Sequence, residues 1–168
     1  MVYSQKRKLG RTALKEEVMG HLGFSYLGLI FLLMLFVPNI IWTKHKPAGY
    51  EDIVGKEKGI LPILERAGQV CVTCCALIFK DFNLPDAFSL WSLWLVATII
   101  LMLLYELSWI RYFTGKHTLE SFYGNLWIIP VPLASLPVTA FLILGIYGKV
   151  IWLVASVIIL GIGHIGIH

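Results

Sequence analysis

Charged residues are absent from four long stretches of the chain. The stretches cover residues 22–43, 87–105, 121–148 and 150–168, and they contain 22, 19, 28 and 19 residues. A helix needs roughly 20 apolar residues to cross the hydrocarbon core of a bilayer. The pattern therefore predicts an all-α integral membrane protein whose apolar helices are joined by polar connectors.

We expect a basic amphipathic segment over residues 1–21 and a single bundle of about five transmembrane helices over residues 22–168. The expected spans are approximately 22–43, 60–80, 87–113, 123–147 and 149–167. The second is the hardest to place, because only 13 uncharged residues separate Arg66 from Lys80. A span that begins near Ile60 puts Glu65 and Arg66 at or below the level of the lipid headgroups. Four spans, with a re-entrant segment over 60–79, are the alternative.

Composition agrees with a membrane location and leaves no room for a separate soluble domain. Hydrophobic residues make up 58% of the chain and the mean hydropathy is +0.78, whereas a globular domain is roughly 45–50% apolar. The polar stretches 1–21 and 43–59 are too short to fold around cores of their own. The lipid bilayer is the expected partner, and the chain is expected to act alone, as a homo-oligomer or within a membrane complex.

The basic residues bear on orientation in the membrane. Five cations precede the first span and favour anionic headgroups; no fold or aromatic platform accompanies them that would indicate nucleic-acid binding. With the N-terminus inside, seven Lys and Arg residues fall on each side of the membrane, so the totals do not decide the topology. Because the first helix usually dominates, we expect a cytoplasmic N-terminus.

The second expected span carries a polar stripe. At 100° per residue, four side chains fall on a face about 80° wide, and they are Glu65, Gln69, Thr73 and Lys80. Polar side chains in a membrane helix seldom face lipid, because burying them unpaired is costly. The stripe therefore indicates either a path for a substrate or ion, or a packing helix whose polar groups bond to its neighbours.

The third expected span has an aromatic flank and an isolated acid. The flank consists of Trp91, Trp94, Thr98, Leu101, Tyr105, Trp109 and Tyr112. It suits interfacial belts and packing, or the wall of an apolar pocket. Glu106 lies off this flank, and Arg111 is about 140° away around the same helix, so the two cannot pair locally. We expect Glu106 to meet a cation from another helix, Arg66 or His164, unless it simply reaches the interface.

Three prolines interrupt the fourth expected span, at positions 130, 132 and 137. Each removes a backbone donor and disturbs the preceding turn, so residues 129–137 are not expected to form regular helix. Broken backbone is tolerated in a membrane where protein or a cavity supplies partners. The segment is therefore either the wall of a cavity or a kinked entry to a helix that begins near Ser135.

Cysteine and histidine residues give only incomplete metal-binding patterns. Cys71, Cys74 and Cys75 lack the second ligand pair that a structural zinc site requires. His164 and His168 are spaced for one helical face, but two histidines do not complete a site. No sequence motif identifies a cofactor, so the cofactor is unknown, and no metal site is expected.

These patterns favour a small membrane protein that binds or transports a small molecule or ion through a polar cleft between helices. The candidate ligand-binding residues are Glu65, Arg66, Gln69, Glu106, Trp109, Arg111 and His164. In this hypothesis Glu65 and Glu106 are the responsive carboxylates, Arg66 or Arg111 is the counter-ion, and Gln69 and His164 are hydrogen-bond partners. An accessory membrane subunit without small-molecule chemistry is one alternative. An intramembrane enzyme that uses Glu, His or Cys is the other.

Overall fold

The computed structural model describes residues 18–53 and 59–167, and this part of the chain is all-helical with no β-strand. The expected helical class is therefore confirmed, whereas the amphipathic segment 1–21 lies almost entirely outside the described residues. The elements are α2 (Tyr26–Trp42), α3 (Tyr50–Ile53), α4 (Ile60–Ile78), η1 (Lys80–Phe82), η2 (Leu90–Ser92), α5 (Leu93–Thr114), α6 (Leu119–Tyr123), α7 (Pro132–Tyr147) and α8 (Ile151–Ile167).

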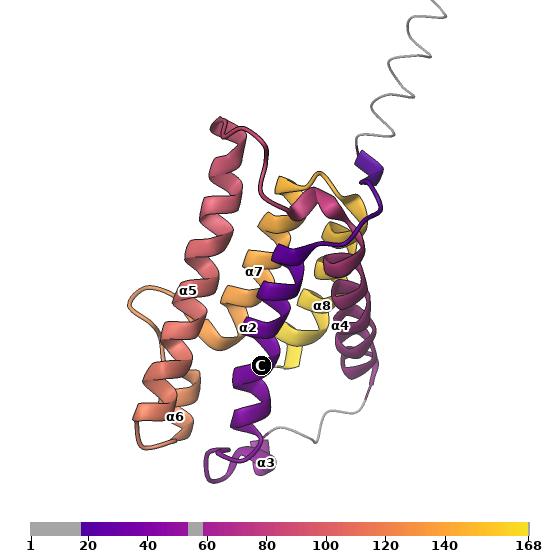
Figure 1. Cartoon of the computed structure of the whole chain (residues 1–168). Coiled ribbons are helices and arrows are strands. Elements are labelled where there is room, and N and C mark those ends of the chain that lie inside the picture. The colour runs from indigo at the N-terminus through magenta and orange to yellow at the C-terminus, as the bar shows by residue number, and fades with distance from the viewer. Residues whose placement is uncertain (1–17, 54–58, 168) are drawn as a thin grey trace, which may run out of the picture.

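The five long helices run in broadly the same direction in Figure 1, and α5 extends farthest toward the upper end. The short helices α3 and α6 lie at the lower end in this view, and η1 lies toward the upper end. Helix α4 packs along α8, α8 along α7, and α7 along α5, while α2 contacts both α4 and α5. The result is a bundle in which α2 lies between α4 and α5.

Within the described residues, two helical segments are long and apolar enough to cross a membrane: α4, and the continuous segment Leu90–Thr114 that joins η2 to α5. Helices α2, α7 and α8 are also apolar but have only 17, 16 and 17 residues. In the most apolar windows of the two long segments, only 17% and 33% of the residues are buried. The central helix of a water-soluble protein, in contrast, has most of its residues buried.

Helix α2 begins later than the expected residue 22, because the residues before it are extended and pair with the end of α4. The Gly23 amide donates to the Ile78 carbonyl at 2.8 Å, and the Ser25 amide donates to the Leu77 carbonyl at 3.0 Å. The Ser25 hydroxyl then caps α2 by accepting from the Gly28 amide at 2.9 Å. These bonds fix α2 against α4 at the upper end of the bundle.

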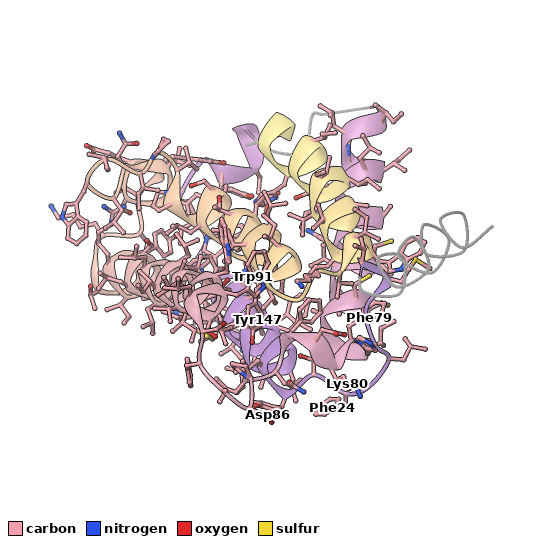
Figure 2. All side chains as sticks on the ribbon, turned by 90° about the horizontal axis from the view of Figure 1, so that it is seen from above. Phe24, Phe79, Lys80, Asp86, Trp91 and Tyr147 are labelled. Atoms are coloured by element: carbon pink, nitrogen blue, oxygen red, sulfur yellow. The ribbon has the colours of Figure 1, made fainter. Side chains whose placement is uncertain are left out.

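The upper end is held by hydrogen bonds between connectors and helix termini (Figure 2). Asn83 accepts from the Tyr26 amide at 2.9 Å, and its own carbonyl accepts from the Tyr147 hydroxyl at 2.9 Å. Trp91 donates its indole N–H to the Tyr147 carbonyl at 2.9 Å, and Figure 2 shows these two labelled side chains next to each other. The connector between α4 and α5 therefore ties α2 to α7.

Helix α7 corrects part of the expectation that residues 129–137 are irregular, because residues 129–131 precede the helix but residues 132–137 belong to it. The helix begins at Pro132 and continues through Pro137. Pro132 is tolerated because the first turn has amides without intrahelical partners in any case. The irregular backbone lies earlier, over residues 124–131, where Val131 has a φ of 41°. The Ser135 hydroxyl donates to the Pro130 carbonyl at 2.8 Å and so joins the turn to the helix.

Candidate functional site

A cleft of about 300 Å³ lies among the five long helices. Its lining comes from α2 (Leu35, Phe36, Asn39), α4 (Gln69, Val72, Thr73), α5 (Tyr105), α7 (Leu133, Pro137, Val138, Phe141) and α8 (Leu160, His164). Most of these side chains are apolar, and the polar ones come from four different helices. The polar stripe predicted on the second span therefore lines the cleft through Gln69 and Thr73.

The cleft exists because α2 and α4 meet closely only at their upper ends. There Gly28 lies directly against the Ala76 carbonyl, with no space for a side chain. Toward the lower end, α2 is joined to α5, because Asn39 donates to the Tyr105 hydroxyl at 2.8 Å. Over the same length α4 packs along α8. Below their contact, α2 therefore packs with α5 and α4 packs with α8, and the cleft lies between α2 and α4.

Two glycines bring α4 and α8 into backbone contact. A Cβ atom added to Gly68 would lie 2.5 Å from the backbone nitrogen of Leu160, and one added to Gly163 would lie 2.8 Å from the Cα of Glu65. Neighbouring heavy atoms cannot approach this closely, so both positions require glycine for this packing. The approach places Glu65 of α4 beside His164 of α8.

Glu65 and His164 form the principal polar pair at the cleft. The Nδ1 atom of His164 is 2.6 Å from the Oε1 atom of Glu65, and their side chains are 22% and 17% exposed. The structure thus brings Glu65 together with His164, one of the two predicted hydrogen-bond partners. Arg66 is exposed. Consecutive residues on a helix point about 100° apart, so Arg66 does not face the same neighbouring helix as Glu65.

A smaller hollow of about 80 Å³ adjoins the cleft. Five of its lining residues are aromatic, and we call them the aromatic pocket: Trp42, Tyr50, Trp109, Phe122 and Tyr123. Asn39, Leu133 and His164 line both hollows, so the two meet at these residues. Trp109 was predicted as a site residue and lies in this pocket, 2% exposed.

The rings of the aromatic pocket support one another. The Trp42 ring stands edge-on to Tyr50 with centroids 4.8 Å apart and stacks on Phe122 with centroids 5.2 Å apart. Tyr50 and Phe122 are also edge-on at 5.7 Å. Such arrangements are favoured by the charge distribution of aromatic rings. The pocket thus joins the end of α2 to α3, α5 and α6.

Tyr50, a residue of the aromatic pocket, is close enough to the Glu65 carboxylate for the two to interact electrostatically. Burial, together with smaller contributions from the neighbouring Tyr123, Glu51 and Glu65, raises the pKa of Tyr50 to about 12. Burial also raises the pKa of Tyr123. Both phenols therefore carry no charge at neutral pH.

Glu106 does not join the site, which contradicts the prediction that it pairs with Arg66 or His164. Its Oε1 atom is buried and has no hydrogen-bond partner within the described residues. His164 is occupied by Glu65, and Glu106 lies on a face of α5 that lines neither hollow. The carboxylate beside the cleft is therefore Glu65 rather than Glu106.

Arg111 also lies outside the cleft and has a local structural role. Its guanidinium donates to the Asn125 carbonyl at 2.8 Å and to the Gly124 carbonyl at 2.9 Å. It lies in the last turn of α5, within reach of the segment that follows α6. These bonds hold the irregular segment between α6 and α7 against α5.

The cysteines show no sign of a metal centre. Cys71 and Cys74 are exposed, and the Cys75 sulfur lies 3.8 Å from the Ser156 hydroxyl. Across residues 18–53 and 59–167 no three His, Cys, Asp or Glu side chains converge on one point. His168, proposed to share a face with His164, lies outside the described residues.

Among the residues that line the two hollows, Tyr105 belongs to the predicted aromatic flank. Asn39 and Tyr50 were not predicted as site residues. Asn39 had a detectable signal, since it is a polar residue inside the apolar stretch 22–43. Tyr50 had none, because it belongs to a connector. No protein-family model, curated protein or solved structure matches this chain.

Proposed function

We propose that this chain is a five-span membrane protein that binds a small molecule in the cleft between α2, α4, α5, α7 and α8. The bilayer location is supported by the apolar helices, by their common direction, and by the low burial of α4 and of the segment Leu90–Thr114. Helices of 16 or 17 residues extend only about 25 Å. We therefore also place the residues that flank α2, α7 and α8 within the thickness of the membrane.

The observation that carries the binding proposal is the combination of apolar walls with a few convergent polar groups. Ligand sites in proteins generally have this character. Here Asn39, Gln69, Thr73 and His164 reach the cleft from three helices, and Tyr105 reaches it from a fourth. A purely structural subunit has no need of such a hollow, so the cleft favours binding over the accessory role.

The enzyme alternative has narrower support. Glu65 and His164 lie within the distance needed for proton transfer. However, Cys75 is ten residues from Glu65 on α4, which corresponds to about 15 Å along the helix axis. A nucleophilic cysteine is therefore not next to the pair, and binding remains the function that the geometry supports best.

Native mass spectrometry of the full chain, purified in nanodiscs, tests the proposal. The wild-type protein should retain a small molecule at a fixed stoichiometry. Thr73→Trp places an indole in the cleft and should abolish retention. Cys71→Trp is the matched control, because Cys71 is exposed and lies about 200° from Thr73 around α4. Equal retention by the two variants, or none by the wild type, would contradict the proposal.

A further inference from the structure

The rings of the aromatic pocket are suited to a cation. Ammonium groups are attracted to the faces of Trp and Tyr rings within about 6 Å of the ring centroid. Two rings of the pocket already lie near an ammonium group. The Lys46 nitrogen is 5.6 Å from the Trp42 centroid and 5.9 Å from the Tyr50 centroid. Lys46 pairs with Glu51 and is not part of the lining, so the hollow itself is free of this side chain.

The charges around the two hollows also favour a cation over an anion. No Lys or Arg side chain is among the described residues that line either hollow. Glu65 is held against His164, a lining residue of both. A positive head group in the aromatic pocket would therefore have the Glu65 carboxylate nearby. Lys46, whose ammonium lies near two of the rings, is paired with Glu51 and is not part of the lining.

The sizes of the two hollows indicate the shape of the ligand. The aromatic pocket, at about 80 Å³, suits a compact head group. The cleft of about 300 Å³ leads from it at Asn39 and Leu133, and its walls are mainly aliphatic and phenyl groups such as Val72 and Phe141. A molecule that fills both has a small polar end and a larger apolar body.

We propose that the site binds an amphipathic organic cation, with its quaternary ammonium head in the aromatic pocket and its apolar body along the cleft. This inference rests on the proposed binding function and specifies its ligand class. The rings would replace part of the hydration of the head group, and a quaternary ammonium loses less hydration than a primary one because it donates no hydrogen bonds. The apolar body would remove the walls of the cleft from contact with water or lipid.

Isothermal titration calorimetry on the full chain in nanodiscs tests this with two probes, octyltrimethylammonium and its uncharged isostere in which carbon replaces nitrogen. The cation should bind at least tenfold more tightly than the isostere. Trp42→Leu and Tyr50→Leu should each weaken the cation roughly tenfold, with little effect on the isostere. Trp152→Leu is the control, because Trp152 is exposed at the start of α8 and should change neither affinity.

The two proposals fail in distinguishable ways. If both probes bind with equal affinity and Thr73→Trp abolishes both, the cation inference is overturned and the cleft proposal stands. If the cation binds equally well to the wild type and to both ring variants, the aromatic pocket is not the head-group site. If neither probe binds while the wild type still retains another molecule that Thr73→Trp excludes, only the ligand class is wrong. Tyr50→Leu keeps the test valid if Trp42→Leu does not fold, because Tyr50 lies in the short helix α3.

Discussion

At the scale of single residues, Glu65 and Glu106 are two carboxylates in similar helices with opposite surroundings. Glu65 is bonded to His164, whereas the buried Oε1 atom of Glu106 has no partner in the described structure. Their sequence contexts do not distinguish them, because each follows apolar residues and each has an arginine nearby. The difference arises from which neighbouring helix each residue faces, and that information is not present in a local pattern.

The two carboxylates should respond differently to the same substitution. Glu65→Gln weakens a hydrogen bond to a group that can carry charge, so it should lower the free energy of unfolding by about 1 kcal/mol. Glu106→Gln removes a group that is poorly solvated when ionised and has no compensating partner, so it should be neutral or stabilising. Thermal unfolding in detergent measures both, with Glu120→Gln in the exposed part of α6 as control. A larger loss for Glu106→Gln than for Glu65→Gln would contradict the assignment.

Tyr50 should make stability depend on alkaline pH. Burial raises its pKa from 10.0 to about 12 in the folded protein. The unfolded chain releases this proton first, so the contribution is present below pH 10 and is lost as the pH rises toward 12. The measurement is the unfolding midpoint between pH 8 and pH 11.5, compared with Tyr50→Phe. The wild type should lose more stability than the variant; parallel curves would show that Tyr50 is not in the buried environment described.

At the scale of elements, the order and nature of the helices could be predicted, whereas their boundaries could not. The stretch 22–43 became α2, but its first four residues are extended because they pair with the end of α4. The prolines indicate a break in the stretch 121–148 over residues 129–137. The observed break covers 124–131, so it overlaps the expected one only at 129–131. Pro132 is compatible with a helix start, so composition alone could not distinguish a broken helix from one that begins late.

Close packing of α4 on α8 can be tested with two glycines of α8. Gly163→Ala would force a methyl group into the backbone of α4 at Glu65, so it should lower the unfolding midpoint by several degrees and separate Glu65 from His164. Gly161→Ala places its methyl group only 3.4 Å from a side-chain methyl of Val138. It should be neutral or slightly stabilising, because alanine favours helix more than glycine does. Equal effects of the two variants would refute the close approach at Gly163.

At the scale of the whole molecule, the site depends on contacts between residues distant in sequence. His164 meets Glu65 across 99 residues, and Asn39 meets Tyr105 across 66. The sequence supplied Gln69, Trp109, His164 and Glu65 as candidates, but it also supplied Arg66, Glu106 and Arg111, which lie elsewhere. Periodicity defines the face on which a residue lies, whereas the neighbour of that face follows from how the helices pack. The site could therefore be predicted only as a set of candidates.

In the proposed membrane bundle, α4 borders an accessible cleft with Gln69 and Thr73 in its wall. Single cysteines in membrane vesicles test this arrangement most directly, with the water-soluble thiol reagent trimethylammonium-ethyl methanethiosulfonate. One variant carries Thr73→Cys with the three native cysteines replaced by serine, and the other retains Cys71 alone. The two positions are about 3 Å apart along the axis of α4 but face opposite sides. We expect rapid modification at position 73 and little at Cys71. Equal rates at the two positions, or faster modification of Cys71, would show that no accessible cleft borders this face of α4.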